Sequence, residues 1–249
     1  MLASHMTEGT PVALVTGGAK RVGRAIVERL AASGFDIAFT YHTSEPQATE
    51  LTLKLMAAGR NVLAIQADLA DSAKAPEAIC KAFCARFGRC DALINSASLY
   101  LPATLKETTL ETMRKLNAVN VESPLMLCKQ FEAQLRESKG HIVNMTDLLA
   151  ERPWPQYLPY CSTKAALTNL TMGLARALAP DITVNAIAPG VVDWPPDYPE
   201  DEKAKYLKRV PLNRAGTPQD VANLVHFLIS SADYITGQII RLDGGRSIT

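Results

Sequence analysis

Residues 11–23 read PVALVTGGAKRVG, a short apolar run followed by a turn that contains Gly17, Gly18 and Gly23. The run predicts a buried strand, and the pattern from Lys20 to Ala32 predicts a helix that opens directly after the turn. Glycines in such a turn let the backbone approach a pyrophosphate, while the helix N-terminus supplies amide donors. The segment therefore favours a dinucleotide-binding βα unit over an ordinary glycine turn.

Short apolar runs alternate with longer helical patterns from this unit to the end of the chain. The expected strands are 11–15, 35–41, 62–66, 92–95, 141–145, 182–187 and 238–241. The expected helices are 20–32, 49–58, 73–87, one long helix within 110–135, 160–178 and 217–229. Such alternation implies a parallel sheet covered by helices on both faces. We therefore expect one doubly wound Rossmann-type α/β domain over residues 7–249, with about seven strands.

The composition disfavours several other classes of protein. The 249 residues suit one α/β domain, and 47% hydrophobic with 20% charged residues is an ordinary globular balance. The net charge of +1 gives no indication of nucleic acid or of an anionic membrane as a partner, and no apolar run approaches the ~20 residues that span a bilayer. Residues 1–6 (MLASHM) resemble an expression-vector remnant, so we expect them to lie outside the domain.

Five cysteines are scattered along the chain: Cys80, Cys84, Cys90, Cys128 and Cys161. The first three have a loosely metal-like spacing, but Cys80 and Cys84 lie on an apparent amphipathic helix with no histidine near. We therefore expect free, buried thiols and no metal site. Together with the lack of a signal-peptide pattern, this predicts a reduced, cytoplasmic compartment.

Tyr160 and Lys164 are candidates for acid–base chemistry. Residues four apart share one face of a helix, so Lys164 lies one turn from Tyr160. A free tyrosine has a pKa of about 10, and a cation about 4 Å away at an effective dielectric near 20 contributes roughly 4 kcal/mol. We therefore expect Lys164 to bring the pKa of the Tyr160 phenol toward neutrality, where acid–base catalysis is most efficient. The pair alone is weak evidence, because such pairs occur on many exposed helices.

The end of the second expected strand indicates which cofactor is bound. It carries hydroxyl groups and one histidine, in the order Thr40, Tyr41, His42, Thr43 and Ser44. A site for NADH would place a carboxylate here to hold the ribose hydroxyls, but no acid occurs before Glu45. Hydroxyls and a histidine, with Lys20 and Arg21 nearby, suit a 2′-phosphate instead. The sequence therefore predicts NADPH rather than NADH.

One long irregular stretch, residues 189–211, follows an expected strand and is rich in proline and acidic residues. Segments of this kind are commonly lids, so we expect this one to close over a substrate, with Trp194 and Tyr198 as wall residues. A solvated insertion is the alternative. Arg152, Pro153 and Trp154 are further candidates for shaping the pocket.

The motifs occur in an order that resembles the short-chain dehydrogenase/reductase family from Pro11 to the C-terminus. Besides the glycine turn and the Tyr160/Lys164 pair, they are Asp68-Leu69, Asn95-Ser96-Ala97-Ser98, Asn120, Pro189-Gly190-Val191, Ile235-Thr236-Gly237 and Asp243-Gly244-Gly245. The resemblance implies that the cofactor is bordered by Gly17, Lys20, Arg21, Val22, Gly23, Leu69, Ser96, Ala97, Pro189, Gly190 and Val191. It also implies a homotetramer formed through long helices.

The same resemblance assigns roles to individual side chains. Asp68 would face the adenine, and Asn95 would lie along the cofactor. Asn120 would anchor a water relay through Lys164, which would also hold the nicotinamide ribose. Tyr160 would be the proton donor or acceptor.

Three departures from the general family pattern resemble the pteridine reductase branch. Arg21 stands where a glycine is usual, Asp147 replaces a serine, and Ser98 replaces the last glycine of a loop motif. The tail at 244–247 (GGRS) fits the same branch. In that branch the arginine approaches the cofactor phosphate and the pterin, the serine contacts the pterin, and an aromatic two residues later, here Tyr100, stacks on it. An ordinary loop aromatic is the alternative reading of Tyr100.

The aspartate at position 147 has a chemical consequence of its own. A ketone reductase needs a neutral donor to polarise a carbonyl oxygen, and an ionised carboxylate cannot donate. The ring nitrogens and exocyclic amine of a pterin are groups that a carboxylate can address. A negative neighbour also raises the pKa of a tyrosine, so we hypothesise that Asp147 keeps Tyr160 protonated for reduction of a C=N bond. A surface acid in a degenerate site is the alternative.

The sequence therefore predicts an NADPH-dependent reductase of dihydropterins or dihydrofolate. Its expected catalytic residues are Asp147, Tyr160, Lys164 and Asn120, and its expected substrate contacts are Arg21, Ser98, Tyr100, Asp147, Tyr160 and Trp194. One alternative is a carbonyl reductase, for example of 3-oxoacyl thioesters, which Asp147 and Arg21 disfavour. The other is a non-catalytic NADP(H)-binding protein, which the complete set of Asn120, Tyr160 and Lys164 disfavours.

Overall fold

The computed structural model describes residues 9–194 and 197–249, so the expected vector remnant at 1–6 lies outside the described residues. Its seven strands are β1 (Val12–Val15), β2 (Asp36–Tyr41), β3 (Val62–Gln66), β4 (Ala92–Asn95), β5 (His141–Met145), β6 (Thr183–Pro189) and β7 (Ile239–Leu242). All neighbouring strands pair in parallel, in the order β3-β2-β1-β4-β5-β6-β7. The winding reverses between β1 and β4, and ligands of such sheets bind at the carboxyl ends of the strands near that reversal. The predicted doubly wound α/β fold is confirmed.

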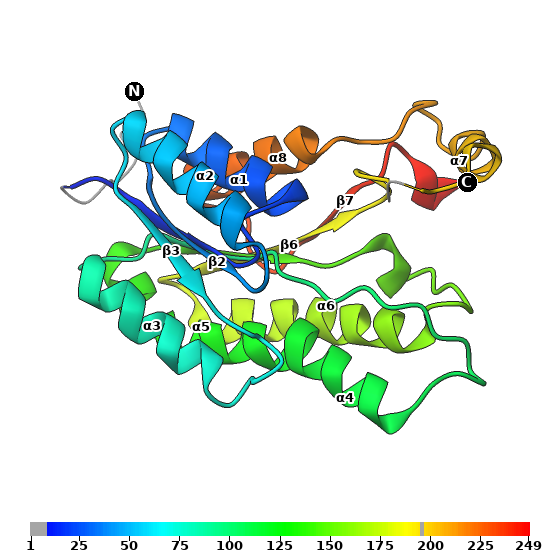
Figure 1. Cartoon of the computed structure of the whole chain (residues 1–249), viewed down its shortest axis with the longest axis horizontal. Helices are drawn as coiled ribbons and strands as arrows, with labels where there is room; N and C mark the ends of the chain where they lie inside the picture. The colour runs from blue at the N-terminus through cyan, green and yellow to red at the C-terminus, as the bar shows by residue number, and fades with distance from the viewer. Residues whose placement is uncertain (1–8, 195–196) are drawn as a thin grey trace.

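Helices cover both faces of this sheet, as Figure 1 shows. One face carries α1 (Arg21–Ala32), α2 (Glu45–Ala57) and α8 (Pro218–Ser230), and the other carries α3 (Ala75–Arg86), α4 (Leu110–Asn117), α5 (Ser123–Ser138) and α6 (Leu158–Leu178). Alternate residues of β1 belong to the two resulting cores, because side chains alternate across a strand. Ala13 and Val15 pack in the core with residues of α1 and α8. Val12 and Leu14 pack in the core with residues of α3 and α5.

The long helix expected within 110–135 is divided into two. α4 ends at Asn117, a π-helical turn spans Ala118–Glu122, and α5 continues to Ser138. Turns of this kind interrupt the regular hydrogen-bond ladder and occur frequently at functional sites. This one carries Asn120, whose side chain is fully buried.

The 189–211 segment, expected to be irregular, contains a short helix, α7 (Glu200–Leu207). Its sequence EDEKAKYL has no apolar stripe, so hydrophobic periodicity gives no indication of it. Acidic residues in the first turn and an ion pair between Lys205 and Asp201, one turn apart, stabilise the helix instead. α2 likewise begins at Glu45 rather than at Thr49, because a proline in the first turn is compatible with a helix start.

Within the described ranges, no helix is long and apolar enough to cross a bilayer, and no group of three His, Cys, Asp or Glu side chains is arranged to hold a metal ion. The cysteines are free, but two of them differ from the expectation of burial: Cys84 is exposed and Cys80 is partly exposed. Ile79 and Phe83 occupy the core-facing stripe of α3, and each cysteine follows one of them by a single residue. Cys80 therefore packs only at the margin of the core, and the Cys84 side chain is exposed.

Candidate active site

The glycine turn lies at the carboxyl end of β1 and leads into α1. Gly17 has a φ of +67°, a left-handed conformation that glycine adopts without strain. A Cβ on Gly18 would lie 2.6 Å from that of Phe39, and one on Gly23 would lie 2.2 Å from the Gly17 carbonyl oxygen. Only glycine fits these close approaches. The first-turn amides of α1 have no acceptor within the helix and are available to an anion.

Arg21 connects this turn to the 189–211 segment. Its Nε donates to Asp193 Oδ2 at 2.5 Å, and its Nη2 donates to the Asp193 carbonyl oxygen at 3.0 Å. Its φ of +51° is uncommon for a residue that carries a side chain. The family resemblance assigns this arginine to the cofactor phosphate and the substrate. In the structure it holds the 189–211 segment against the glycine turn.

The residues expected at the adenine and 2′-phosphate end lie at the carboxyl ends of β2 and β3. The run Tyr41–Ser44 leads from the end of β2 to the start of α2. His42 Nε2 lies 3.8 Å from Asp68 Oδ2, and both side chains are more than half exposed. Leu69, in contrast, is buried in the core, and its carbonyl oxygen accepts the Ser123 hydroxyl at 2.8 Å. Its side chain therefore serves packing.

Thr16 joins the two loops at the winding reversal, a role that the sequence analysis missed. Its Oγ1 accepts the backbone N–H groups of Ser96 and Ala97, both at 3.0 Å. The neighbouring Asn95 is buried and donates to Asn144 Oδ1 at 2.8 Å, whereas its own Oδ1 has no partner among the described residues. The sequence feature that could have indicated this role is the position of the Thr16 hydroxyl, directly between the expected strand and Gly17.

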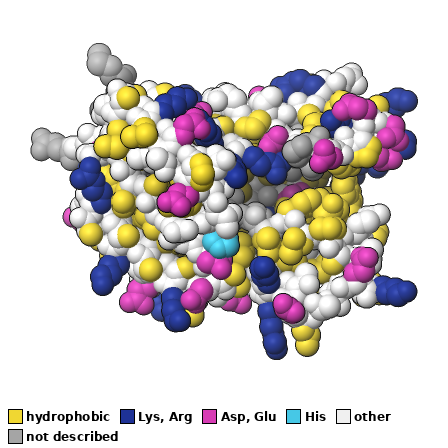
Figure 2. Space-filling model, in the orientation of Figure 1, with side chains coloured by type: hydrophobic (Ala, Val, Ile, Leu, Met, Phe, Trp, Pro, Cys, Tyr) yellow, Lys and Arg dark blue, Asp and Glu magenta, His cyan; other side chains and the backbone are white. Residues whose placement is uncertain are grey.

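A cleft of about 1110 Å³ opens at the carboxyl edge of the sheet. Figure 2 shows the hollow, with hydrophobic side chains over part of its wall. It exceeds the range of about 300–1,000 Å³ that is typical of a site for one small ligand. Its predicted lining residues are Gly17, Lys20, Arg21, Val22, Gly23, Ser96, Ala97, Ser98, Tyr100, Asp147, Arg152, Trp154, Tyr160, Pro189, Gly190, Val191, Trp194 and Tyr198. Lining residues that the sequence analysis missed are Pro102, Leu148, Leu149, Pro155, Gln156, Tyr157, Val192, Asp193, Glu202, Tyr206 and Arg246.

Tyr160 and Asp147 form a hydrogen-bonded pair in the wall of this cleft. Tyr160 lies in the first turn of α6, and its hydroxyl donates to Asp147 Oδ2 at 2.6 Å. Asp147 follows β5 closely, and its Oδ1 accepts the backbone N–H of Leu149 at 2.8 Å. Because both carboxylate oxygens are engaged, the carboxylate has a fixed position relative to the phenol.

Burial raises the pKa of Tyr160 well above its usual value, and the adjacent Asp147 carboxylate raises it further. The pKa of Asp147 is also raised, chiefly by burial. The expectation that Lys164 brings the pKa of the Tyr160 phenol toward neutrality is therefore wrong. Lys164 Nζ lies 5.7 Å from the centroid of the Tyr160 ring and donates to the Met145 carbonyl oxygen at 2.8 Å, so a backbone dipole holds the ammonium. Desolvation of the phenol outweighs the attraction of this more distant charge.

Lys164 itself is buried and lies outside the lining of the cleft. Burial lowers the pKa of Lys164 to about 8, and the charge of Asp147 partly opposes this shift. The ammonium therefore loses its proton in the mildly alkaline range instead of near the usual value for lysine.

Asn120 holds the loop after β4 against α6. Its Oδ1 accepts the Ser98 hydroxyl at 3.2 Å and the Leu99 N–H at 2.8 Å. Its Nδ2 donates to the Leu99 carbonyl oxygen at 3.0 Å and to Thr163 Oγ1 at 3.1 Å. No hydrogen bond joins Asn120 to Lys164 in the part of the chain that the structure describes. Asn120 thus fixes the position of Ser98, and the water relay implied by the family resemblance stays a prediction.

Three tyrosines make a continuous aromatic surface beside Asp147. Tyr100 stacks on Tyr157, with 4.5 Å between ring centroids and 17° between planes, and it meets Tyr160 edge-on at 4.7 Å. Tyr100 nevertheless remains 45% exposed. Tyr100, the expected stacking residue, is thus itself stacked on a second ring. Tyr157 was missed although it ends a stretch rich in aromatic and proline residues.

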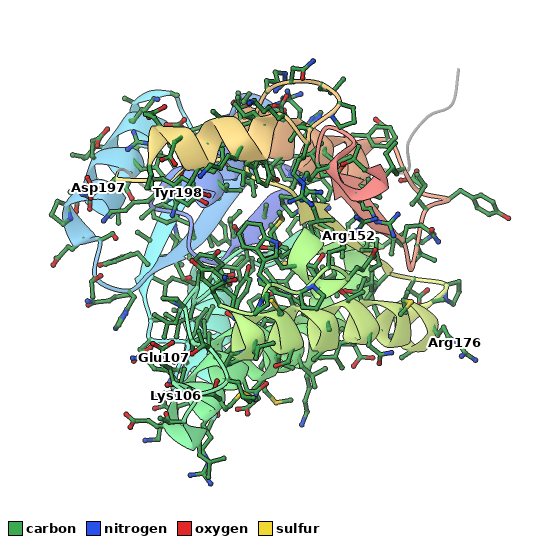
Figure 3. The ribbon with its side chains drawn as sticks, turned by 90° about the vertical axis from the view of Figure 1, so that its right-hand side faces the viewer. Lys106, Glu107, Arg152, Arg176, Asp197 and Tyr198 are labelled. Carbon is green, nitrogen blue, oxygen red and sulfur yellow. The ribbon has the colours of Figure 1, made fainter. Side chains whose placement is uncertain are left out.

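A second aromatic group lies on the 189–211 segment. Trp194 contacts Tyr198 at 4.8 Å and the ring of Tyr206 at 5.4 Å between centroids. The Tyr206 hydroxyl accepts the backbone N–H of Val191 at 3.1 Å, which joins α7 to the strand end before it. In Figure 3, Tyr198 and Arg152 both lie above α6. Tyr206 was missed because α7 was not predicted.

Comparisons with known proteins find relatives that match this chain over nearly its whole length. A family described as Enoyl-(Acyl carrier protein) reductase matches residues 17–247. Pteridine reductase 1 of Leishmania tarentolae is 34% identical over 96% of this chain and 97% of its own length. L-2,3-butanediol dehydrogenase of Corynebacterium glutamicum and 3-oxoacyl-[acyl-carrier-protein] reductase FabG of Staphylococcus epidermidis are each 36% identical over 94% of this chain and 97% of their own lengths. Overall identity therefore does not separate these activities.

Solved structures of similar fold include two with a nicotinamide cofactor. A blue fluorescent protein from a metagenomic library, in complex with NADPH, has a TM-score of 0.89 and 37% identity, covering 95% of this chain and 97% of that one. A short chain dehydrogenase from Burkholderia cenocepacia, in complex with NADP, has a TM-score of 0.88 and 36% identity, with the same coverage of both chains.

Proposed function

This chain belongs to the short-chain dehydrogenase/reductase family, and we propose that it is an NADPH-dependent reductase of pteridines. It reduces a C=N bond of a dihydropterin or of dihydrofolate. The observation that carries this proposal is the 2.6 Å hydrogen bond from the Tyr160 hydroxyl to the buried carboxylate of Asp147. The similarity to Pteridine reductase 1 supports it.

The cleft residues fit NADP(H). Gly17 and Gly18 leave no room for a side chain beside the turn, and the first-turn amides of α1 can donate to a pyrophosphate. Lys20 and His42 are exposed near the ends of β1 and β2, where they can hold a 2′-phosphate. When bound, NADPH supplies the hydride. The complexes of the two similar structures with NADPH and NADP support this assignment.

Tyr160 supplies the proton. Because burial and Asp147 hold the pKa of its phenol well above the usual value, the hydroxyl stays protonated at physiological pH and acts as an acid. As the proton leaves, negative charge develops on the phenol oxygen, and the nearby Lys164 ammonium stabilises it. The remaining lone pairs of the Asp147 carboxylate can accept a ring N–H or the exocyclic amine of a pterin.

The shape of the cleft suits a flat bicyclic substrate. The stacked pair of Tyr100 and Tyr157 borders it near Tyr160, and Trp194 with Tyr206 borders it on the 189–211 segment. Aromatic faces and edges at such sites gain stacking energy with a flat ring. We further propose that the 189–211 segment closes over the substrate.

A carbonyl reductase is the second candidate, and the similarity to 3-oxoacyl-[acyl-carrier-protein] reductase favours it. At position 147, however, a carbonyl oxygen would meet a carboxylate that can only accept. A protein that binds NADP(H) without catalysis is a third candidate. The proposal also includes a homotetramer and a cytoplasmic location, with no nucleic-acid or membrane partner.

The test is the loss of NADPH absorbance with purified protein and dihydrobiopterin, dihydromonapterin, dihydrofolate or an acetoacetyl thioester, repeated with NADH. The proposal predicts turnover of a pterin or of dihydrofolate with NADPH. Turnover of the thioester alone would contradict it in favour of a carbonyl reductase. Cofactor binding without turnover of any of these compounds would indicate a binding protein.

A further inference from the structure

Within the described residues, a buried arginine whose guanidinium has no hydrogen-bond or ion-pair partner lines the cleft beside the 189–211 segment. Arg246 is only 6% exposed, and its Nε has no hydrogen-bond acceptor. None of the hydrogen bonds or ion pairs among the described residues involves its guanidinium. Buried polar groups almost always have partners in folded proteins, and a buried charge without one is costly. A ligand that supplies an acceptor at this point would remove that cost.

The backbone around Arg246 fixes its position. The Asp243 carboxylate accepts the backbone N–H groups of Gly245 at 2.9 Å and Ser247 at 2.7 Å. A Cβ on Gly244 would lie 2.8 Å from Val210 Cγ1, so the turn needs glycine to pack where it does. The turn thus presents Arg246 in one place. It also occupies both oxygens of the nearby acid with backbone amides.

The surroundings of Arg246 are short of negative charge. Its guanidinium carbon lies 5.7 Å from the centroid of the Tyr206 ring. Burial lowers the pKa of Arg246, and the charges of Arg209 and Arg152 lower it further, which places three arginines within electrostatic reach of one another. Asp243 acts in the opposite direction. An anion entering this end of the cleft is therefore attracted by several charges.

The other charges in this part of the cleft already have partners. Asp193 accepts from Arg21, and Glu202 accepts from Lys205 at 2.7 Å. Arg152 donates to the Thr249 carbonyl oxygen at 3.1 Å. Arg246 is thus distinguished from them, within the described ranges, by being both buried and unpaired.

The strand order indicates which ligand reaches Arg246. The expected 2′-phosphate end of the cofactor lies at β2, on one side of the winding reversal. Arg246 follows β7, the last strand on the other side, and Tyr160 precedes β6 between them. A molecule in the cleft near Arg246 is therefore on the side of the cleft away from the adenine, where the substrate lies.

We propose that Arg246 binds an anionic group, a carboxylate or a phosphate, on the side chain of the pteridine substrate. This inference rests on the proposed function for the identity of the pterin ring. A planar guanidinium forms paired hydrogen bonds with either anion, which favours it over other cations at such a site. The enzyme then discriminates between pterins by the charge of the side chain, whereas Asp147 and Tyr160 act on the ring.

The test compares steady-state reduction of dihydroneopterin, dihydroneopterin monophosphate and dihydrofolate by the wild type and by Arg246→Gln. Loss of a charge-assisted pair predicts a KM about tenfold to a hundredfold higher for the anionic substrates, with a smaller change for neutral dihydroneopterin. Comparison of dihydroneopterin monophosphate with dihydrofolate shows whether Arg246 binds a phosphate or a carboxylate. Arg246→Lys keeps the charge and should recover part of the loss.

Arg209→Gln is the matched control, because it removes the same charge from an exposed residue outside the lining of the cleft. Arg209 acts on an anion in the cleft only at long range, so Arg209→Gln should change the ratio of KM values for charged and neutral substrates much less than Arg246→Gln does. An equal rise in KM for all three substrates in Arg246→Gln would overturn the proposal and assign Arg246 to packing against Tyr206.

A failure of the proposed function would be recognised separately, by absent turnover of all three pterins in the wild type. In that case, quenching of tryptophan fluorescence by dihydrofolate measures binding alone. Weaker binding by Arg246→Gln than by the wild type and Arg209→Gln would uphold the anion site. Equal binding by all three proteins would overturn it.

Discussion

The two walls of the cleft differ in how their polar groups are satisfied. On the wall formed by the end of β5 and the start of α6, Tyr160 donates to Asp147 and Lys164 donates to a backbone carbonyl. On the wall formed by the 189–211 segment and the tail after β7, the Arg246 guanidinium has no hydrogen-bond or ion-pair partner among the described residues, and Arg21 forms a partly exposed ion pair. In the proposed function, the groups that act on the reacting bond are therefore preorganised, whereas Arg246 gains an acceptor only when the substrate binds.

The difference follows from the elements that build each wall. The catalytic wall consists of a buried strand end and a long helix whose inner residues are in the core. The recognition wall consists of a loop, the polar helix α7 with no buried residue, and a short turn after the edge strand β7. Substitutions on the catalytic wall should therefore change the rate or the stability, and substitutions on the recognition wall should change mainly KM.

The largest expected effect is that of Tyr160→Phe. Removing the proton donor should lower kcat for a dihydropterin by about 10²–10⁴-fold, because general acid catalysis contributes about that much. NADPH binding, measured by cofactor fluorescence, should remain. Tyr234→Phe is the control, since Tyr234 is fully exposed and should keep the wild-type rate. A kcat within tenfold of the wild type would mean that the proton comes from another group.

The pH dependence of kcat/KM should follow the protonation state of Lys164. Because the pKa of Lys164 is lowered to about 8, kcat/KM should fall about tenfold per pH unit as the pH rises past that value and the ammonium is lost. Ionisation of the Tyr160 phenol does not cause this fall in kcat/KM, since the pKa of Tyr160 is held well above the usual range. Asp147 raises the pKa of Lys164, so in Asp147→Ser the fall in kcat/KM should begin at a lower pH.

The lowered pKa of Lys164 should also make the stability of the protein depend on pH. A lysine with a lower pKa in the folded than in the unfolded state disfavours folding while it is charged. The free energy of unfolding should therefore rise as the pH increases from about 8 toward the unfolded value of about 10.4, and Lys164→Met should remove this rise. Denaturant titrations at several pH values measure it. If the alkaline fall of kcat/KM and the rise in the free energy of unfolding were both unchanged in Lys164→Met, another group would be responsible for them.

Asn120 supports the catalytic wall through its hydrogen bond to Thr163 of α6, so variants of Asn120 and Trp194 should differ in stability. Asn120→Ala removes four hydrogen bonds from a fully buried site and should lower the free energy of unfolding by about 1–3 kcal/mol. Trp194→Ala lies on the recognition wall and should raise KM for the pterin with less change in stability. Urea denaturation and steady-state kinetics on both variants test the contrast. A larger loss of stability in Trp194→Ala would refute it.

The smallest expected effect is that of Asp193→Asn. The pair with Arg21 is partly exposed, and such pairs contribute about 0.2–1 kcal/mol. KM for NADPH and for the pterin should therefore change by no more than about fivefold, measured at low ionic strength. A change of a hundredfold would show that this contact governs access to the cleft rather than adding a minor constraint.

Much of the fold could be predicted, because it depends on local patterns. All seven strands were predicted, three of them with the observed bounds at Val62–Gln66, Ala92–Asn95 and His141–Met145. What could not be predicted arises from features without an apolar period. α7 is stabilised by charge pairs, and the π-helical turn at Ala118–Glu122 is an irregularity within a continuous helical pattern.

The candidate site shows a similar limit. The hypothesis for Asp147 gave the correct direction for the pKa of the Tyr160 phenol. The spacing of Tyr160 and Lys164 gave the wrong direction, because burial cannot be read from an i, i+4 pair. Tyr157 and Tyr206 line the cleft but lie in no motif that indicates it, and Arg246 lies in the 244–247 tail, which the sequence analysis did not assign to the cleft. Their positions depend on how distant segments pack.

In the proposed function, Asp147 selects a C=N bond over a carbonyl group. The most direct test is kcat/KM for dihydrobiopterin relative to an acetoacetyl thioester, both with NADPH, in the wild type and in Asp147→Ser. We predict that the wild type prefers the pterin and that this ratio falls by at least about tenfold in the variant, because the carboxylate that accepts the Tyr160 hydroxyl is lost. A ratio unchanged by the substitution, with full turnover of dihydrobiopterin, would contradict the claim.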